Sequence, residues 1–315
     1  RKMIKMGEKA GTVMCQVLTD EGKQNGDLVV LTSDSRGSGS LVPFATALPK
    51  QIVEVGIAEQ DLVTISAGLA HSGKRTFAVS PASFLTMRSI EQVKTDVTYS
   101  NANVKLIGIS GGNSYSVLGS THHSLQDLAI TRALPNLEVY MPSDQYQTAA
   151  LFKYLAHSDV PAYVRIGKKI LPDIYANEAD AFSQPGHANV VRQGKDVALI
   201  AAGETVQTAL DAADELAKVG VDATVVDLVS VKPLDTKLID QLCHDYPALI
   251  TIEEHSIING IGSAVADRVA ANGNTKLKII GFPDEPAIAG TQDEVFKYYG
   301  IDGEDVAKQA RNLLA

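Results

Sequence analysis

The chain has 315 residues, of which 45% are hydrophobic and 21% charged, enough to fill the cores of two medium-sized domains. Its net charge of -9, with only 28 Lys and Arg residues, argues against a nucleic-acid or anionic-membrane partner, because such partners require a basic surface. No apolar run is long enough to span a bilayer, and the two cysteines, Cys15 and Cys243, lie far apart, so we expect a cytoplasmic protein with reduced thiols.

In the first half of the chain, apolar strands are expected to alternate with helices. A helical period covers residues 7–22, and the apolar run at 28–31 predicts a buried strand. Later segments repeat this alternation: strands at 76–79, 104–109, 137–141 and 162–166, and helices at 81–99, 125–132 and 144–157. Such alternation is typical of a doubly wound parallel sheet, which we assign to residues 1–178.

The second half predicts another domain of the same class. Residues 179–194 lose the apolar period and contain Pro185 and Gly186, as expected of a linker. Beyond it, strands are expected at 197–201, 223–228, 248–252 and 277–280, with helices at 204–219, 235–244 and 260–271 and two short helices in 292–314. The fold class is therefore α/β, with a second doubly wound, mainly parallel domain at 195–315.

The stretch 53–71 contains an acidic residue in an unusual setting. It reads as the end of a buried strand, a turn at Gly56, and a helix with Glu59 in its first turn, beside Ile57 and Ala58. An acid in this position commonly does no more than complement the helix dipole. Its neighbours on the same edge of the predicted sheet suggest a further role.

Those neighbours follow other strands of the first domain. The Gly- and Ser-rich loop at 32–40 follows the strand at 28–31, where open α/β sheets bind ligands, although a plain flexible loop would look the same. His122 and His123 lie in a polar loop after a later strand, and Arg165 ends another. A histidine there could carry a proton, and the arginine could hold a phosphate.

Two other patterns resemble a known type of site, but their sequence context argues against that function. The G-x-S-x-G run at 108–112 matches a hydrolase nucleophile elbow, but no helical period follows it. Glu253, Glu254 and His255 point in different directions along a strand, so we interpret them as solvated or interface charges rather than metal ligands. We therefore expect no metal site within this chain.

Several motifs, in the same order, resemble the C-terminal half of the transketolase family, which uses thiamine diphosphate. They are VGIAEQ at 55–60, SFLTMRSIEQV at 83–93, STHHSLQDLAITR at 120–132, MPSD at 141–144, VRIGK at 164–168, VSVKPLD at 229–235 and TIEEHSIINGIGSAV at 251–265. That half comprises a pyrimidine-binding domain and a C-terminal domain. The GDG motif that holds the diphosphate and its metal in the family's N-terminal domain is absent from the sequence.

The resemblance therefore implies one subunit of a split transketolase. Its partner, the N-terminal subunit, would hold the diphosphate and Mg²⁺ or Ca²⁺, in an assembly that we expect to be α2β2. Glu59 would activate the cofactor by a hydrogen bond to its pyrimidine ring and so count as catalytic. Phe84 would stack on that ring, and Asp34 and Ile57 would also contact the cofactor.

The resemblance also assigns the substrate side. Ser38, Arg88, His122 and Arg165 match positions that contact substrate hydroxyl or phosphate groups, and His122 would assist proton transfer. The expected reaction is transfer of a two-carbon ketol unit between phosphorylated sugars. The alternatives are the β subunit of a 2-oxoacid dehydrogenase, half of a deoxyxylulose-phosphate synthase, and a non-catalytic assembly subunit.

Two departures from the family pattern leave the sugar itself open. Leu118 stands where an aspartate commonly recognises a donor hydroxyl, and an arginine often found before the first helical period is replaced near Gly11. The sequence predicts the reaction class but not the sugar pair.

Overall fold

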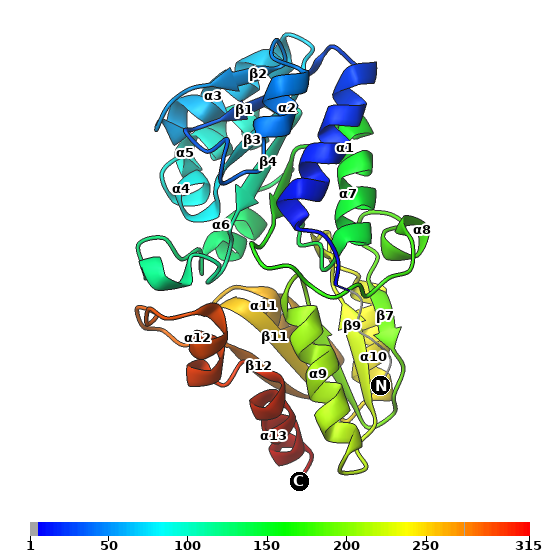
Figure 1. The fold of residues 1–315 in the computed structure, drawn as a ribbon. Coiled ribbons are helices and arrows are strands. Elements are labelled where there is room, and N and C mark those ends of the chain that lie inside the picture. The colour runs from blue at the N-terminus through cyan, green and yellow to red at the C-terminus, as the bar shows by residue number, and fades with distance from the viewer. Residues whose placement is uncertain (1–5, 274) are drawn as a thin grey trace.

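Buried strands alternate with helices along both halves of the chain, and the computed structural model, which describes residues 6–273 and 275–315, arranges them as two α/β domains (Figure 1). The first domain contains most elements up to residue 165. Its helices are α1 (Ala10–Gln24), α2 (Val42–Ala47), α3 (Glu59–His71), α4 (Ala82–Met87), α5 (Ile90–Gln92), the π-helix η1 (Val93–Tyr99), the short 3₁₀ helix η2 (Ser116–Leu118), α6 (Asp127–Ala133) and α7 (Gln145–His157). Its strands are β1 (Leu28–Thr32), β2 (Ile52–Glu54), β3 (Arg75–Pro81), β4 (Val104–Ile109), β5 (Glu138–Tyr140) and β6 (Ala162–Arg165).

The first sheet is buried on both faces, which explains why its strands read as continuous apolar runs. Along β1, Leu28 and Val30 pack into the core on the α1 and α7 side, while Val29 and Leu31 pack against α3. The strand order is β10-β5-β6-β4-β3-β1-β2 among the described residues, with every pair parallel except β10 with β5. The expected doubly wound parallel sheet is confirmed.

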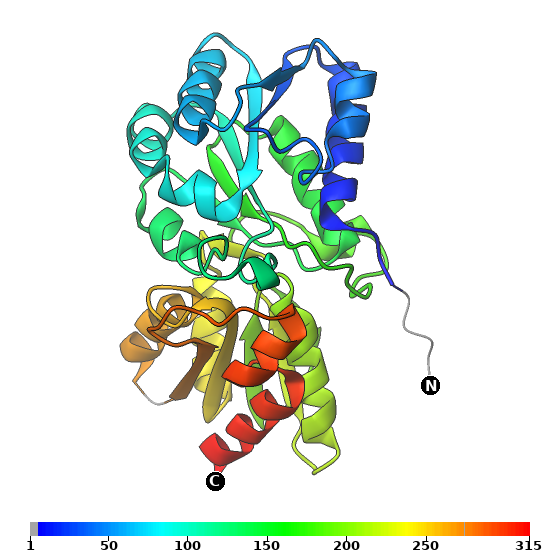
Figure 2. The same ribbon diagram turned by 60° about the vertical axis from the view of Figure 1, so that its left-hand side comes forward.

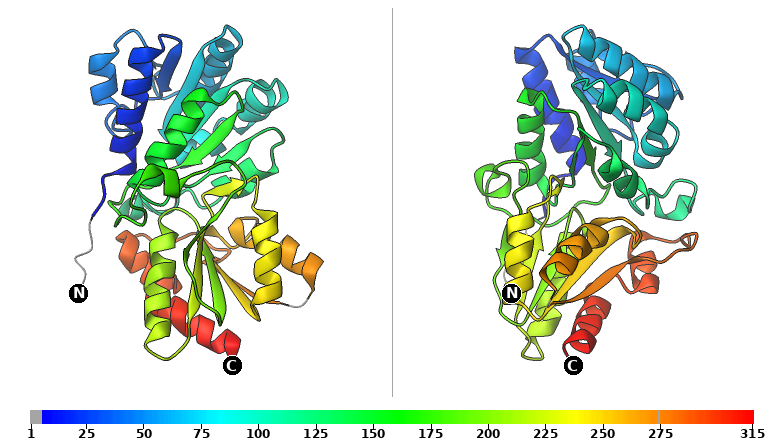
Figure 3. Two further views of the ribbon diagram at one scale, coloured as in Figure 1. Left: turned by 90° about the vertical axis from the view of Figure 1, so that its right-hand side faces the viewer. Right: turned by 180° about the vertical axis from the view of Figure 1, so that it is seen from behind.

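The second domain repeats this plan. Its helices are α9 (Thr205–Ala217), α10 (Thr236–Asp245), α11 (Ile261–Asn272), α12 (Gln292–Tyr299) and α13 (Gly303–Leu314), preceded by the one-turn α8 (Glu178–Ala181). Its strands are β7 (Asn189–Arg192), β8 (Val197–Ala201), β9 (Ala223–Asp227), β11 (Ala248–Ser256) and β12 (Lys276–Phe282). The sheet order is β12-β11-β8-β9-β7, and only the edge strand β7 runs antiparallel. Helices α9 and α13 cover one face, and α10 and α11 the other (Figure 3).

Two strands correct the expected division of the chain. Strand β7 lies inside the range 179–194 that was expected to be a linker, and β10 (Ser230–Lys232), which follows β9 along the chain, pairs with β5 of the first sheet. Both are short edge strands whose burial is mixed, so neither produces the apolar run that reveals a buried strand.

Two local elements also differ from expectation. The helix expected at 81–99 is divided into α4, α5 and η1, and the short helix α2 was not expected because the polar loop before it gives no apolar period. Its first turn contains Pro43, which suits that position.

The domains share one apolar core cluster. It joins Leu128 and Val139 of the first domain to Ile239, Ile261 and Val265 of the second. The domains therefore pack directly on one another, one above the other in Figures 1 and 2. Within residues 6–273 and 275–315, no helix has the length and apolarity needed to cross a membrane.

Candidate active site

The carboxyl-end edge of the first sheet gathers four of the expected site residues. Glu59 begins α3, Phe84 and Arg88 lie in and after α4, and His122 follows β4. Arg88 contacts both Glu59 and Phe84, and the Phe84 ring contacts the ring of His122. The sequence pattern placed Glu59 and His122 at one edge of the sheet, and Phe84 and Arg88, which were assigned from the resemblance alone, lie beside them.

The turn before α3 fixes the position of Glu59. Gly56 has a φ of 74°, a left-handed conformation that favours glycine, and it lets the chain leave β2 and enter α3 directly. The side chain of Glu59 is only 4% exposed, whereas Ile57 beside it is 74% exposed. A nearly buried carboxylate thus lies next to an apolar side chain that reaches into solvent.

Among the described residues, Glu59 has one charged partner, Arg88. Arg88 Nη1 lies 3.2 Å from Oε1 and 3.1 Å from Oε2 of Glu59, and the carbon of the same guanidinium lies 4.2 Å from the centroid of the Phe84 ring. Glu59 and Arg88 border a cavity of about 470 Å³, lined by Ile57, Ala58, Glu59, Gln60, Asp61 and Arg88. The flat cation therefore lies both against the carboxylate and over an aromatic ring.

The two adjacent histidines have different environments. His122 contacts Phe84 and Tyr115 edge-on, with ring centroids 5.3 Å and 5.8 Å away, and its Nδ1 lies 3.0 Å from the hydroxyl of Thr121. His123 is buried, and its Nε2 lies 2.9 Å from the carbonyl oxygen of Ser116. Burial lowers the pKa of His123, which favours its neutral form and a structural role. His122 is the histidine that can meet a ligand.

Asp34 lies in the exposed loop after β1, and a carboxylate that sequence reasoning missed holds this loop. Glu54 Oε1 accepts hydrogen bonds from the backbone N–H of Asp34, at 2.6 Å, and from that of Gly56, at 3.1 Å. Glu54 Oε2 also lies 3.3 Å from Nε of Arg36. Glu54 therefore connects the loop of Asp34 to the turn that leads into Glu59.

A second cavity carries positive charge close to His122. It measures about 230 Å³ and is lined by Lys9, Gly11, Gly37, Ser38, Ser40, Ile109, Ser110, Tyr115, Ile166, Gly167 and Lys168. Lys168 Nζ lies 5.5 Å from the centroid of the Tyr115 ring, which itself contacts His122. The cavity thus combines two lysines with Ser38, a set that suits an anionic group. Neither lysine was singled out from the sequence, although Lys168 stands in the VRIGK motif.

Arg165 corrects a sequence expectation. Its side chain is buried, Nη2 donates a hydrogen bond to the backbone carbonyl of Glu254 at 2.5 Å, and Nε lies 3.6 Å from Oδ2 of Asp127. The end of β6 is covered by the second domain, so the guanidinium faces buried carboxylates rather than an open cleft. Lys168, three residues further along, takes the exposed position that we expected for Arg165.

The residues expected to be solvated or interface charges are all buried. Glu253 accepts hydrogen bonds from the N–H groups of Ile261 and Gly262 at the start of α11, and Glu254 faces the first domain. Burial raises the pKa of Glu253 to about 7 and lowers that of His255 to about 4. The interface interpretation is correct for Glu254, and the solvated one is wrong.

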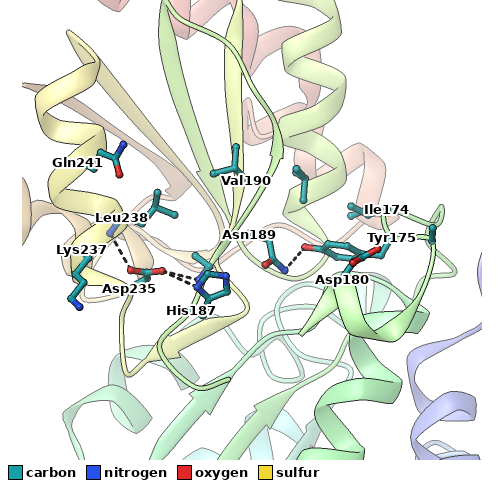
Figure 4. A pocket seen from close by; sticks show the side chains of 13 residues that line it. Ile174, Tyr175, Asp180, His187, Asn189, Val190, Asp235, Lys237, Leu238 and Gln241 are labelled. Carbon is teal, nitrogen blue, oxygen red and sulfur yellow. Dashed lines mark hydrogen bonds and ion pairs between the residues drawn. The ribbon is translucent and has the colours of Figure 1, made fainter. Parts of the chain in front are cut away.

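A separate cavity of about 630 Å³ contains none of the expected site residues. It lies between the segment after β6, strand β7 and helix α10, and two pairs of its polar side chains contact one another (Figure 4). His187 Nδ1 lies 3.7 Å from Asp235, which caps α10, and Asn189 donates a hydrogen bond to the hydroxyl of Tyr175. Among residues 6–273 and 275–315, no group of three or more His, Cys, Asp and Glu is arranged to bind a metal.

Both domains match known protein families. The family described as "Transketolase, pyrimidine binding domain" matches residues 9–173, and the family "Transketolase, C-terminal domain" matches residues 186–306. The chain is 45% identical over 293 residues to an apulose-4-phosphate transketolase subunit of Phocaeicola vulgatus, covering 93% of each chain. It is 32% identical over 297 residues to a 6-deoxy-6-sulfo-D-fructose transketolase subunit of a Clostridium species, covering 94% of this chain and 92% of the relative.

Longer relatives match less closely. A 1-deoxy-D-xylulose-5-phosphate synthase of Desulfotalea psychrophila is 31% identical over 312 residues, but the match covers only 47% of that protein. Among solved structures, one described as "Split gene transketolase, inactive beta4 tetramer" superposes with a TM-score of 0.90 at 33% identity, covering 98% of this chain and 99% of that one.

Proposed function

The chain belongs to the transketolase family, and from this premise we propose that it transfers two-carbon ketol units between anionic sugars together with an N-terminal partner subunit. The observation that carries the proposal is the buried carboxylate of Glu59, which borders a cavity beside the ring of Phe84. Near-complete coverage of a relative that is itself named a transketolase subunit supports the split arrangement. The longer deoxyxylulose-phosphate synthases are more distant and match only in part.

The residues around Glu59 fit the pyrimidine ring of thiamine diphosphate. In this structure they already accommodate a flat group with N–H donors, the guanidinium of Arg88, which lies against the carboxylate and over the Phe84 ring. An aminopyrimidine is likewise planar and would meet the same two residues, with the carboxyl group of Glu59 in its protonated form donating a hydrogen bond to a ring nitrogen. When bound, thiamine diphosphate supplies the nucleophilic carbon and the electron sink that cleavage beside a ketose carbonyl requires.

Glu59 and Phe84 would hold the pyrimidine, and Ile57 and Asp34 would border it from the turn before α3 and the loop after β1. Arg88 has to release Glu59 for this to happen, because a guanidinium and a pyrimidine ring cannot share one carboxylate face. The half-exposed Arg88 side chain can move into solvent, and the nearly buried carboxyl group of Glu59 that it leaves would then meet the cofactor instead. This gives Arg88 a role before cofactor binding, beside the substrate contact expected from the sequence.

His122 is positioned to carry a proton at the substrate. Its Nδ1 is hydrogen-bonded to Thr121, while no bond to Nε2 is found among the described residues, so Nε2 can bind a hydroxyl group. Phe84 and Tyr115 hold the ring from two sides.

The anionic end of the sugar would lie in the cavity of Lys9, Lys168 and Ser38. Two relatives act, by their names, on a sugar phosphate and on a sulfonated sugar, which both carry an anion at one end. Two ammonium groups attract either anion without the planar fork that an arginine would supply. Lys168→Ala should therefore raise the KM of the phosphorylated substrate about tenfold or more at nearly constant kcat, as expected for loss of a charged hydrogen bond worth about 1.5–3 kcal/mol.

The partner subunit would cover the exposed side of the Glu59 cavity. Ile57 (74% exposed), Met87 (56%) and Val42 (56%) lie in and around α2, α3 and α4 and offer apolar area for such an interface. We expect the partner to hold the diphosphate and Mg²⁺ or Ca²⁺, the assembly to be α2β2, and the reaction to take place in the cytoplasm.

Reconstitution tests the proposal. The chain, an N-terminal transketolase subunit, thiamine diphosphate and Mg²⁺ are mixed, and ketol transfer from xylulose 5-phosphate and from apulose 4-phosphate is compared with turnover of pyruvate. Transfer from a sugar phosphate only in the complete mixture is the expected result. Turnover of pyruvate alone would favour a 2-oxoacid dehydrogenase subunit, and lack of cofactor binding by the mixture would favour a non-catalytic subunit.

A further inference from the structure

The second domain holds the loop that carries His122. This histidine loop, residues 110–124 between β4 and α6, belongs to the first domain by sequence but lies over the segment that leads into α12 (Figures 1 and 2). Ser120 Oγ donates a hydrogen bond to the carbonyl oxygen of Ala287 at 2.8 Å. Just after the loop, Leu125 packs into the core of the second domain, and its carbonyl accepts the N–H of Ser256 at 2.9 Å.

Glu254 holds the base of this loop. The Oε1 atom of this residue of β11 accepts the backbone N–H of Asn113 at 2.8 Å, and its backbone carbonyl accepts the guanidinium of Arg165 at 2.5 Å. The preceding Gly112 packs so closely that a Cβ there would collide with Nη2 of Arg165 and with Cδ of Glu254. The first turn of the loop is therefore wedged between a strand end of each domain.

Glu254 is itself held from a second direction. The amide nitrogen of Gln292, at the start of α12, donates to Glu254 Oε1 at 2.7 Å and to Glu204 Oε2 at 2.6 Å. Burial, together with the charge of Glu204, raises the pKa of Glu254, while Arg165 opposes that rise. Helix α12 therefore helps to hold the carboxylate oxygen that accepts the N–H of Asn113.

We propose that Glu254 is a positioning residue for the transfer reaction, which acts through the histidine loop to keep His122 between Phe84 and Tyr115. This inference rests on the proposed function, because it takes His122 to act at the substrate. It gives the second domain a specific part in catalysis, although none of its described residues lines the cavity of Glu59.

Asp227 offers a matched control. It is likewise a buried carboxylate of the second sheet that contacts the first domain, since it accepts hydrogen bonds from Ser143 Oγ at 2.6 Å and Gln147 Nε2 at 2.9 Å near the start of α7. It makes no contact with the histidine loop among the described hydrogen bonds. Its loss should weaken the interface between the domains without moving His122.

The experiment compares Glu254→Ala, Glu254→Gln and Asp227→Ala in the reconstituted holoenzyme. Glu254→Ala should lower kcat/KM for the sugar phosphate about a hundredfold, the size of effect that a 1 Å misplacement produces. Glu254→Gln, which retains an acceptor oxygen for Asn113, should recover most of this loss. Asp227→Ala should keep kcat/KM within about threefold of the wild type, although the unfolding temperature falls in both alanine variants.

Two further measurements separate positioning from stability. Amide hydrogen exchange in residues 111–124 should quicken in Glu254→Ala and not in Asp227→Ala, and the dissociation constant of thiamine diphosphate should stay within about twofold in both. If Glu254→Ala does not fold, Gln292→Ala takes its place, because it removes the hydrogen bond between Glu254 and α12. This variant should also lower kcat/KM, but by a smaller factor. Equal losses of kcat/KM in the Glu254 and Asp227 variants, or none in either, would overturn the proposal. An inactive wild-type holoenzyme would instead refute the proposed function.

Discussion

Two charged regions of the molecule differ in how deeply their charged side chains are buried. The rim, formed by Glu59, Arg88, Phe84 and Ile57, leaves Arg88 half-exposed and Ile57 largely in solvent. The seam between the domains, formed by Arg165, Asp127, Glu204, Glu254 and Asp227, is largely buried. Arg165 pairs with Asp127 and Glu254, while Glu204 and Asp227 accept hydrogen bonds from side chains within the chain. A buried carboxylate is therefore a candidate for ligand binding when its cationic partner can move into solvent. It is a structural group when that partner is buried with it.

The largest effect should come from the rim carboxylate. Glu59→Gln keeps the size of the side chain but cannot take up or release a proton, so we expect the reconstituted activity to fall by about 10²–10⁴-fold, the range typical of a lost proton-transfer group. Glu304→Gln is the control, because Glu304 also lies in the first turn of a helix, α13, is exposed, and does not line the cavity. Equal losses from both variants would mean that these acids only complement the helix dipole.

The seam cation should matter for folding. Arg165→Met leaves Asp127 and Glu254 buried without their cation, so we expect the free energy of unfolding, measured in urea, to fall by about 3–5 kcal/mol. Arg192→Met removes a cation from an exposed pair, Arg192–Asp214 at 2.6 Å, and should cost at most about 1 kcal/mol. A loss of similar size in both would show that the seam is open to water.

The pH dependence of stability should identify a seam carboxylate. Burial raises the pKa of Asp227 to about 6, so the folded chain holds this proton more tightly than the unfolded chain does. That contribution is present at low pH and is lost as the pH rises through 6, whereas the side chain introduced by Asp227→Asn cannot ionise. The unfolding free energy of Asp227→Asn minus that of the wild type should therefore increase by on the order of 2 kcal/mol between pH 4 and pH 7. A difference that stays constant over this range would contradict the raised pKa.

The smallest effect should come from the rim cation. Arg88→Met removes the group that occupies Glu59 before the cofactor arrives, so calorimetry on the reconstituted pair should show thiamine diphosphate binding on the order of tenfold more tightly. Arg268→Met, which breaks a comparable pair with Asp240 on α10, should leave this affinity unchanged. Weaker binding in Arg88→Met would mean that Arg88 contacts the bound cofactor or substrate instead.

The sequence predicted the rim better than the seam, for a physical reason. A glycine turn between a strand and an amphipathic helix is a local pattern, so Glu59 could be placed from residues 53–71 alone, and the family prediction is confirmed by both matched domains. Arg165 could not be placed in this way. Whether a strand end is open or covered depends on which surface the second domain packs against, and that contact joins residues far apart in the chain.

Edge strands were missed for a related reason. Strands β7 and β10 are short and only partly apolar, and each finds its partner through tertiary packing rather than through its own pattern. A pair of adjacent acids such as Glu253 and Glu254, directly after the apolar run at 248–252, was the available signal of a buried polar site. It was interpreted as a pair of solvated or interface charges, because adjacent residues along a strand point in different directions.

The return of β10 to the first sheet has a practical consequence for anyone who wants to divide this protein. A fragment that stops after β6 would lack the outermost strand of its own sheet and expose the unpaired edge of β5, and the complementary fragment would carry an orphan strand. The two domains are therefore joined by more than their linker. They can be exchanged between relatives as one block, but not shuffled as independent modules.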